Sequence, residues 1–571
     1  MKRLLIAGAI LLGGSLQAQT HLHDAQTKIE FTSRGASNYT LVNLNSGGYA
    51  MASIAEDASG EPTGGILITT LNSLMAVEHS LEMAMPDANG FGVAYEPQDI
   101  IQNSNGDLII CGKVIVEAGD RGGFLMQINY DARGAGLTYD WSKLYPYTVG
   151  PGRTAVMSLN GVIETDDGYA VIGQSQALPA NGILIGTRRD GNINWARDIR
   201  DDQHGNTSTV LNDIVSIGGG NFAVVGTVNS FPADDDDIMI CKFNAFGVVQ
   251  GNQVYERLGE SDFDNDFTFH EMAKGLVYDR SNNTLTVAGM VQKKIHGICV
   301  AAEYRRILSL QVEANTLNPI WAHEYEIPTD LLIINEGLSS ESIAYDPVSA
   351  TFAIAGWVNN FAFSLVSEDN GFILRIDALG YSTDLRMYGN KTGERLNKII
   401  LSDATGEFVA AGTRSPTKNQ PWLVESFESI NEECEQISGF DETYDVEVDI
   451  MSGLIMTVFP EVSKITPIPR SPLVNEVTIC PRIPLMRSSS VEENKMDANI
   501  YPTITSGLVI IESTVHQSYR VYDISSGKIL QFGTIKASKE QLDLSNLAKG
   551  IYLLELEGKG SDKTIKRIIK Q

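Results

Sequence analysis

The 571-residue sequence is poor in cysteine, tryptophan and histidine, with five, five and eight of each. So few cysteines in so long a chain exclude a fold held together by disulfides. Beyond the N-terminal segment there is no run of 18 apolar residues, so we predict no transmembrane helix. Basic residues are also scarce, because 43 Lys and Arg stand against 71 Asp and Glu and give a net charge of −28. Such an acidic surface repels phosphates, and we therefore predict no nucleic-acid partner.

The common catalytic motifs are missing as well. The sequence contains no His-Glu-x-x-His, Gly-x-Ser-x-Gly, Walker loop or Cys-x-x-Cys pair, which are the frequent signatures of metal, nucleophile and phosphate sites. We therefore predict no catalytic residues and no cofactor, apart from the calcium considered below.

The N-terminus has the pattern of a secretory signal peptide. Lys2 and Arg3 precede an apolar run over residues 4–12, and small residues follow up to Ala18. A basic start, a short hydrophobic stretch and a small residue before the cut are typical of such signals. We predict a signal peptide over residues 1–18 and export of the remaining chain.

A repeat of about 60 residues determines the predicted architecture. Each copy has a turn rich in Gly, Asp or Asn, followed by an apolar strand that ends at a small residue. Further β-rich segments flank it, and several copies close with a strand that begins at Trp. The copies end at Ser53, Gly112, Gly173, Gly226, Gly289, Gly356 and Gly412.

Four antiparallel strands repeated seven times are typical of a seven-bladed β-propeller, which we predict over residues 19–430. The last copy lacks a fourth strand, whereas residues 27–32 form a strand-like segment ahead of the first copy. We expect that N-terminal strand to complete blade seven and close the ring, since closure leaves no open sheet edge. An open solenoid is the alternative.

The pattern of turn, apolar strand to Gly, apolar strand, and then Asp or Asn before Gly and Trp resembles repeats of secreted β-propeller proteins from Bacteroidetes-type bacteria. The resemblance covers residues 27–430 and implies the fold alone, because propellers carry unrelated functions.

The character of the sequence changes after residue 430. Residues 431–485 are rich in Pro and contain a short alternating segment at 445–450, so we expect a small β module there. Cys434 and Cys480 flank this stretch of an exported chain, and we predict a disulfide between them, with two free thiols as the alternative. The Ser-rich, polar residues 486–495 are predicted to be a linker.

The last segment, residues 496–571, contains the most specific motifs. It has Tyr-Pro near its start, Ser-Gly and Ser-Ser-Gly-Lys turns, Gly-Ile-Tyr-Leu-Leu, and a basic C-terminal strand. Short alternating strands divided by such turns predict a β-sandwich. The segment resembles the type A C-terminal sorting domain of Bacteroidetes type IX secretion cargo proteins. The matching residues are Tyr501, Pro502, Gly507, Asp523, Gly527, Lys528, Gly550, Tyr552, Lys566 and Lys570.

This resemblance implies two partners, an outer-membrane translocon that recognises the domain and a sortase-like peptidase that removes it. It also implies a secreted or outer-cell-surface location, reached through the periplasm.

One acidic run is a candidate calcium site. Asp262, Asp264 and Asp266 place carboxylates at alternate positions, and Ca²⁺ binds such oxygen-rich loops. Phe267 stands where an EF-hand loop has glycine, so a solvated acidic loop is the alternative. A second run, residues 234–237, is the weaker candidate.

Two main functions remain open for the propeller. The first is a non-enzymatic binding or adhesion protein with an extracellular glycan or protein ligand. The alternative is an enzyme that degrades an extracellular polysaccharide or peptide, with an active site at the propeller channel to which several blades contribute. Converging carboxylates with Arg or Tyr at the channel mouth would favour the enzyme. A structural spacer is a third possibility.

Overall fold

In the computed structural model, all regular secondary structure of the described residues is β-strand. The described residues are 25–31, 35–56, 62–84, 93–116, 122–132, 134, 136–145, 147–150, 153–155, 157–175, 180–200, 208–230, 235–257, 267–295, 302–327, 337–360, 368–388, 393–414, 420–426, 436–438, 442–445, 448–451, 454–456, 463–464, 468–470, 474–480, 498–501, 504–505, 508–513, 516–523, 529–535, 539–548, 550–558 and 563–570. The chain divides into two compact units, Met1–Pro484 and Leu485–Gln571.

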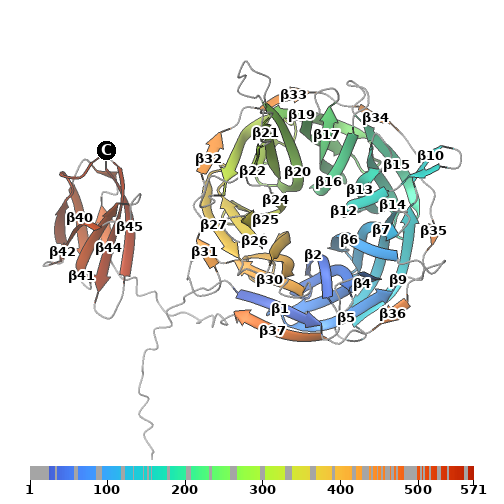
Figure 1. The fold of residues 1–571 in the computed structure, drawn as a ribbon, viewed down its shortest axis with the longest axis horizontal. Coiled ribbons are helices and arrows are strands. Elements are labelled where there is room, and N and C mark those ends of the chain that lie inside the picture. The colour runs from blue at the N-terminus through green and yellow to red at the C-terminus, as the bar shows by residue number, and fades with distance from the viewer. Residues whose placement is uncertain are drawn as a thin grey trace, which may run out of the picture. The chain divides into compact units, whose positions relative to one another are not determined.

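The first unit is a β-propeller in which four-stranded antiparallel sheets are arranged as a ring (Figure 1). The innermost strands are β2 (Gly35–Leu44), β6 (Val93–Gln102), β12 (Met157–Thr165), β16 (Ser208–Gly218), β20 (Phe267–Asp279), β24 (Leu338–Asp346) and β28 (Glu394–Leu401). The second strands are β3 (Gly48–Glu56), β7 (Leu108–Val116), β13 (Gly168–Ser175), β17 (Asn221–Ser230), β21 (Thr284–Ile295), β25 (Thr351–Asn360) and β29 (Phe408–Arg414).

The outer half of each sheet follows in the same order around the ring. The third strands are β4 (Pro62–Asn72), β8 (Gly122–Asp131), β14 (Gly182–Arg188), β18 (Asp235–Phe243), β22 (Ala302–Glu313), β26 (Glu368–Ile376) and β30 (Gln420–Ser426). The fourth strands are β5 (Val77–Ala84), β9 (Gly136–Tyr145), β15 (Ile193–Arg200), β19 (Val249–Arg257), β23 (Pro319–Glu326), β27 (Ser382–Tyr388) and, for the last sheet, β1 (Ala25–Phe31). A separate pair, β10 (Tyr147–Gly150) and β11 (Arg153–Ala155), lies between the second and third sheets in the chain.

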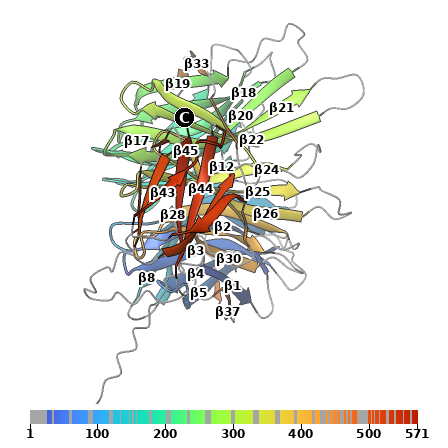
Figure 2. The same ribbon diagram turned by 90° about the vertical axis from the view of Figure 1, so that its left-hand side faces the viewer.

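Among the described residues there are thus seven such sheets, here called units 1 to 7 in the order of their inner strands. The ten-stranded sheet contains units 4 and 5, which are joined by one parallel pairing between β18 and β20. Unit 5 has the longest strands, of 13, 12 and 12 residues, and they extend beyond their neighbours (Figure 2).

The ring closes in unit 7, where the N-terminal strand meets the end of the propeller sequence. β1 pairs antiparallel with β30, and Thr27 lies opposite Leu423. A hydrophobic core also joins unit 7 to unit 1, because Val409, Ala411 and Leu423 pack with Leu41 and other side chains of β2 to β4. Similar cores lie between the other neighbouring units, so each sheet buries both of its faces.

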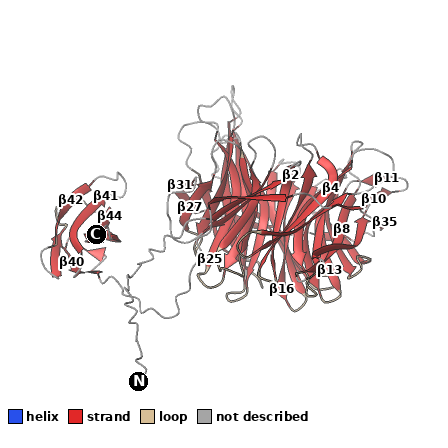
Figure 3. Ribbon diagram, turned by 90° about the horizontal axis from the view of Figure 1, so that it is seen from below, coloured by secondary structure: helices blue, strands red, loops and turns tan. Residues whose placement is uncertain are grey.

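The turns between first and second strands, and between third and fourth strands, gather at one edge of the sheets (Figure 3). Each inner strand ends at this edge and therefore begins at the opposite one. Many turns use an Asx arrangement, as where Asn244 Oδ1 accepts hydrogen bonds from the backbone N–H groups of Phe246 and Val248 at 3.0 Å each. These turns explain why Asp or Asn recurs three residues before Gly in the repeat.

The segment that we expected to be a separate small β module does not form one in the described residues. Its short strands instead add to the outer edges of the propeller sheets, and we call residues 436–480 the belt. The belt strands are β31 (Gln436–Ser438), β32 (Glu442–Asp445), β33 (Val448–Met451), β34 (Leu454–Met456), β35 (Ser463–Lys464), β36 (Ile468–Arg470) and β37 (Val474–Cys480).

The belt follows the ring in the direction opposite to the propeller sequence. It pairs with β27, β23, β19, β15, β9 and β5 of units 6 to 1, and then with β1 of unit 7. Figure 1 shows these strands in orange around the outside of the ring. Strands of two to seven residues cannot bury a core of their own, whereas the fourth strand of each unit offers an open edge.

The second unit is a β-sandwich of two sheets, which confirms the β-rich fold expected for this segment. One sheet contains β38 (Ala498–Tyr501), β40 (Leu508–Ser513) and β43 (Lys539–Asp543). The other contains β39 (Ile504–Thr505), β45 (Lys563–Lys570), β44 (Gly550–Gly558), β41 (His516–Asp523) and β42 (Ile529–Thr534). Val509, Val521, Leu542 and Leu554 belong to the buried core between them.

Candidate functional site

Each of the seven inner strands contains a β-bulge. In β6, Pro97 pairs with Gly112 and Asp99 with Cys111, so Gln98 has no partner in the register. A bulge bends the strand and re-aims the side chain of the extra residue. The extra residues of the seven strands are Asn38 and Tyr39 together in β2, and then Gln98, Asn160, Asn212, Lys274, Glu341 and Asn397.

The glycine of each repeat lies opposite the bulge, and the bulge requires it. A Cβ on Gly112 would lie 2.0 Å from the carbonyl oxygen of Glu96, and one on Gly173 would lie 1.8 Å from that of Ser158. Gly226, Gly289, Gly356 and Gly412 show the same approach, at 1.8 to 2.3 Å. The first repeat has Ser53 at this position, opposite Asn38 and Tyr39.

The bulged side chains line one cavity of about 440 Å³ to which all seven inner strands contribute. Tyr39 and the six single bulged residues all belong to its lining. These side chains are polar, although the strands that carry them are otherwise largely apolar. The cavity is therefore a polar channel site assembled from seven repeats, and we call it the channel site.

Two of the bulged amides connect neighbouring units. Asn160 Nδ2 donates to the carbonyl oxygen of Leu211 at 2.7 Å, and Asn212 Nδ2 donates to that of Ala273 at 2.7 Å. In both cases the acceptor immediately precedes the bulged residue of the next unit. We call these two contacts the amide staples.

A partly buried charge cluster lies beside the bulges. Lys398 Nζ lies 3.1 Å from Asp99 Oδ1, and the other oxygen of Asp99 accepts the backbone N–H of Val162 at 3.1 Å. Asp213 Oδ2 accepts the backbone N–H of Leu276 at 2.8 Å. Each aspartate thus ties its own unit to the next one along the ring.

Burial and charge shift the pKa values in this cluster. Desolvation raises the pKa of Asp213 to about 6, although the neighbouring Lys398 opposes that shift. Asp99 and Asp213 together hold the pKa of Lys398 above its ordinary value, although burial alone would lower it. Lys398 is therefore charged at neutral pH, while Asp213 exchanges its proton near pH 6.

The other carboxylates of the channel site also have partners. Glu96 lies 3.0 Å from Lys113 Nζ and accepts a hydrogen bond from Gln98 Nε2 at 2.8 Å. Glu341 Oε1 accepts the indole N–H of Trp357 at 2.9 Å. Within the described residues no group of three His, Cys, Asp or Glu side chains is placed to hold a metal ion.

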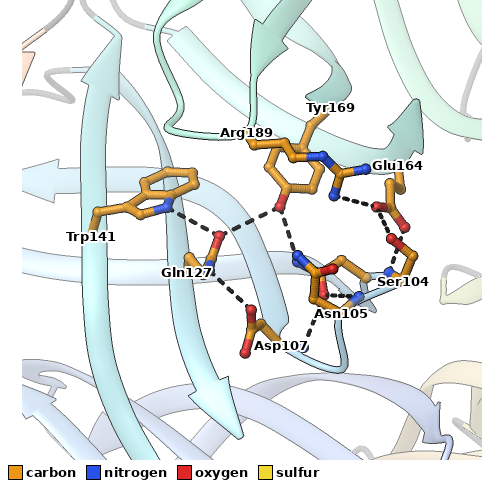
Figure 4. Close-up of polar contacts among 9 residues, drawn as sticks. Ser104, Asn105, Asp107, Gln127, Trp141, Glu164, Tyr169 and Arg189 are labelled. Atoms are coloured by element: carbon orange, nitrogen blue, oxygen red, sulfur yellow. Dashed lines mark hydrogen bonds and ion pairs between the residues drawn. The ribbon is translucent and has the colours of Figure 1, made fainter. Parts of the chain in front are cut away.

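A second polar cluster connects units 2 and 3 (Figure 4). Gln127 Oε1 accepts hydrogen bonds from Trp141 Nε1 at 3.0 Å and from the Tyr169 hydroxyl at 3.4 Å. Its Nε2 donates to Asp107 Oδ2 at 3.1 Å. Because these groups satisfy one another across the two units, the cluster supports the contact between them. The contacts to Glu164 come from Ser104 and Arg189.

The predicted calcium ligands Asp262, Asp264 and Asp266 lie outside the described residues. In the weaker candidate run, Asp236 accepts a hydrogen bond from Asn229 Nδ2 at 2.9 Å, and its other oxygen lies 3.2 Å from His270 Nδ1. That carboxylate therefore supports the packing of β17, β18 and β20.

The predicted disulfide is likewise outside the described side chains. Cys434 is not described, and Cys480 is the last residue of β37. Cys111 and Cys241 are buried free thiols, and burial raises the pKa of Cys241 to about 12. A thiol so difficult to ionise is unreactive.

In the C-terminal sandwich, two of the predicted sorting residues hold one turn. Lys570 Nζ donates to the carbonyl oxygens of Ser545 and Leu547, and the Tyr552 hydroxyl donates to that of Ala548 at 2.7 Å. Tyr501, Asp523, Gly550 and Lys566 lie on β38, β41, β44 and β45. The remaining predicted residues, outside the described part, are Pro502, Gly507, Gly527 and Lys528.

Comparison with known proteins identifies this C-terminal unit. The family described as "Secretion system C-terminal sorting domain" matches residues 499–571. Residues 499–571 are a type IX secretion sorting domain. The presence of this sorting domain indicates a secreted or cell-surface protein. In the described residues, no helix is long and apolar enough to cross a membrane.

No curated protein matches the chain. Several solved structures of low sequence identity match a large part of the chain. A GH93 α-L-arabinofuranosidase of Fusarium graminearum is 10% identical, with a TM-score of 0.37, and the match covers 71% of this chain and 98% of that one. The polysaccharide lyase Uly1 is 10% identical, with a TM-score of 0.39 and coverage of 71% and 90%. A protein of unknown function from Dyadobacter fermentans is 10% identical, with a TM-score of 0.35 and coverage of 61% and 97%.

Sequence reasoning did not find the channel residues, although a signal for them exists. Each single bulged residue is a polar residue 13 to 15 positions before the glycine of its repeat, as Asn160 is before Gly173. The spacing varies by only two positions because a short turn joins the inner strand to the second strand in each repeat. The bulge itself does not follow from the sequence pattern of one repeat.

Proposed function

We propose that this exported protein is a binding protein whose channel site holds an extracellular saccharide. The observation that supports this function most strongly is the ring of polar side chains that seven bulges direct into one cavity of about 440 Å³. Cavities of this size suit small ligands or single sugar units. Amide, hydroxyl and charged groups on all sides are suited to the many hydroxyl groups of a sugar.

Binding explains the carboxylates of the channel site better than catalysis does. Asp99 and Asp213 each accept a backbone N–H group of the neighbouring unit, and Glu96 is paired with Lys113. A catalytic pair needs two carboxylates that both face the substrate. The carboxylates of the channel site instead support the packing of the ring.

A glycan array, probed with the mature full chain with and without Ca²⁺, tests this function. We expect retention of a defined set of saccharides, and weaker retention by an Asn397→Ala variant, because Asn397 lines the channel site. Val348→Ser is the matched control, because Val348 is 93% exposed on a turn. Absence of any saccharide binding by the wild-type protein would refute the proposal. Loss of binding only without Ca²⁺ would support the predicted calcium loop.

A specific observation keeps the enzyme as a second candidate. The pKa of Asp213, raised to about 6 by burial, is suited to a general acid near neutral pH. An enzyme of this kind would release reducing ends or unsaturated products from a polysaccharide panel. An Asp213→Asn variant would lose that activity while it keeps an oxygen to accept the Leu276 N–H. Binding without turnover would exclude the enzyme.

A further inference from the structure

Lys274 interrupts the pattern of amide staples. Asn160 and Asn212 occupy the bulges of units 3 and 4 and donate to the next unit. Lys274 occupies the equivalent bulge of unit 5. Units 3 and 4 have a short amide at this position, whereas unit 5, the next unit, has the long cationic side chain of Lys274.

Within the described part of the chain, Lys274 makes no ion pair or hydrogen bond, although it lines the channel site. The two other lysines of the lining are neutralised, Lys113 by Glu96 at 3.0 Å and Lys398 by Asp99 at 3.1 Å. Glu341, on the next bulge, accepts the Trp357 indole N–H and lies beyond ion-pair distance of Lys274. An unpaired ammonium group in a confined cavity attracts an anion.

Two buried groups of the same cavity have unused hydrogen-bonding capacity. The hydroxyl oxygen of Ser158, a residue 3% exposed, and the Oδ1 atom of Asn397 have no hydrogen-bond partner among the described residues. Both residues line the channel site. Hydroxyl groups of a bound sugar supply the donors and acceptors that these two atoms need.

Together, these observations define the chemistry of the ligand. We propose that the channel site selects an acidic saccharide, whose carboxylate pairs with Lys274 while its hydroxyl groups bond to Ser158 and Asn397. This inference rests on the proposed function, since it assigns the class of saccharide to the same site. The overall charge of −28 makes the local cation more discriminating, because acidic ligands are repelled elsewhere on the protein.

The experiment compares oligosaccharides of galacturonate, glucuronate, mannuronate and guluronate with their methyl esters, using isothermal titration of the mature full chain. Esterification removes the charge and keeps the sugar. We expect at least one acidic oligosaccharide to bind about tenfold or more tightly than its ester, as is typical of a charge-assisted hydrogen bond.

Two variants test whether Lys274 causes the preference for the acid over its ester. Lys274→Asn places the amide of units 3 and 4 in unit 5, so the fold is retained, and we expect the acid and its ester to bind equally. Lys143→Asn removes the same charge from β9, outside the channel site, and should leave the preference for the acid unchanged. Thermal unfolding of both variants verifies that they are folded.

The possible results separate this inference from the proposed function. If saccharides bind but the wild-type protein does not prefer acids, or Lys274→Asn keeps the preference, the acidic ligand is wrong and the binding function stands. If no saccharide binds the wild-type protein, both are wrong. The comparison of acid and ester on the wild-type protein needs no variant, so misfolding of a variant cannot obscure it.

Discussion

At the scale of single residues, two positions of each repeat act together. The bulged residue provides the side chain that faces the channel, and the glycine opposite provides the space for the bulge. At Gly173 the carbonyl oxygen of Ser158 occupies the place of a Cβ, at 1.8 Å. The recurring glycine thus permits the geometry of the bulge, and the polar residue that differs between the repeats determines which chemical group faces the channel.

The first prediction concerns this glycine. Gly173→Ala should destabilise the propeller by about 3 kcal/mol, because the new methyl group overlaps backbone that cannot move without breaking the bulge. Gly406→Ala is the control, since its Cβ would meet nothing within 4 Å although its φ is +73°. The left-handed backbone alone should cost about 1 kcal/mol of stability. Urea unfolding followed by tryptophan fluorescence measures both. Equal losses would show that the close approach at Gly173 is not what requires glycine.

The second prediction concerns Asp213, whose pKa is raised to about 6 in the folded protein. The unfolded chain holds the proton with a pKa of about 3.9, so the folded state binds it more tightly. The contribution of Asp213 to the free energy of unfolding is therefore complete below about pH 4, and it is lost as the pH rises through about 6. Asp99 and Lys398 are the charges that face Asp213, and Lys398 limits the loss.

Thermal unfolding at pH 4.5 and pH 7.5 tests the second prediction. As the pH rises from 4.5 to 7.5, the thermal midpoint of the wild-type protein should fall relative to that of the Asp213→Asn variant. Asparagine does not ionise, and its side-chain oxygen can still accept the Leu276 N–H. A difference between the two proteins that is the same at both pH values would contradict the assignment.

At the scale of elements, the belt changes the relation between the sheets. Each belt strand pairs with only a few residues of an outer strand, such as Ile455 opposite Ile199, but together the seven strands cover an edge in every unit. β1 is held from both sides, by β30 and by β37. The first and the last described strands of the first compact unit therefore pair in one sheet, and the belt reinforces the closure that β1 provides.

The third prediction follows from the belt. Deletion of residues 436–480 from the full chain should lower the thermal midpoint and promote self-association, because seven outer strands then present unpaired edges. Differential scanning calorimetry and light scattering measure the two effects. A chain that lacks residues 496–571 but retains the belt is the control. Its propeller should have the same thermal midpoint and the same degree of self-association as that of the wild-type protein. Unchanged melting and a monodisperse solution after loss of the belt would show that its pairings contribute nothing.

At the scale of the whole molecule, the chain consists of two compact units. The sorting domain has its own core between two sheets, and its last strand supplies Lys570, which holds the turn at 545–547. The channel site lies within the propeller, in the first compact unit. The sorting domain and the proposed binding site therefore belong to different compact units.

The fourth prediction concerns the sorting domain and its role in export. Deletion of residues 496–571 should leave the protein in the periplasm of the native host, because the translocon no longer has its recognition domain. Cell fractionation and immunoblotting measure the distribution, and the Gly173→Ala variant controls for defects of the passenger alone. Unchanged appearance outside the cell would mean that export does not depend on this domain.

The sequence by itself determined the elements and their number. Alternating apolar residues, β-branched strands and Asx turns act over a few residues, so they can be recognised without knowing the fold, and the sorting motifs are equally local. The glycine of each repeat was visible for the same reason, although its purpose was not. The acidic composition likewise predicts that the protein has no nucleic-acid partner, since net charge depends on no geometry.

Only the tertiary structure decided what lies at the centre and what lies at the rim. Tyr39, Lys274 and Asn397 are separated by more than a hundred residues from one another in the sequence, and they share one cavity because the ring closes and a bulge in each strand directs them inward. The belt was misread as a module because its strands are too short to reveal their partners, which lie in six different repeats and the N-terminal strand. Both outcomes depend on pairings between distant segments, and the energy of such pairings is set by the assembled sheets and cannot be read from local sequence.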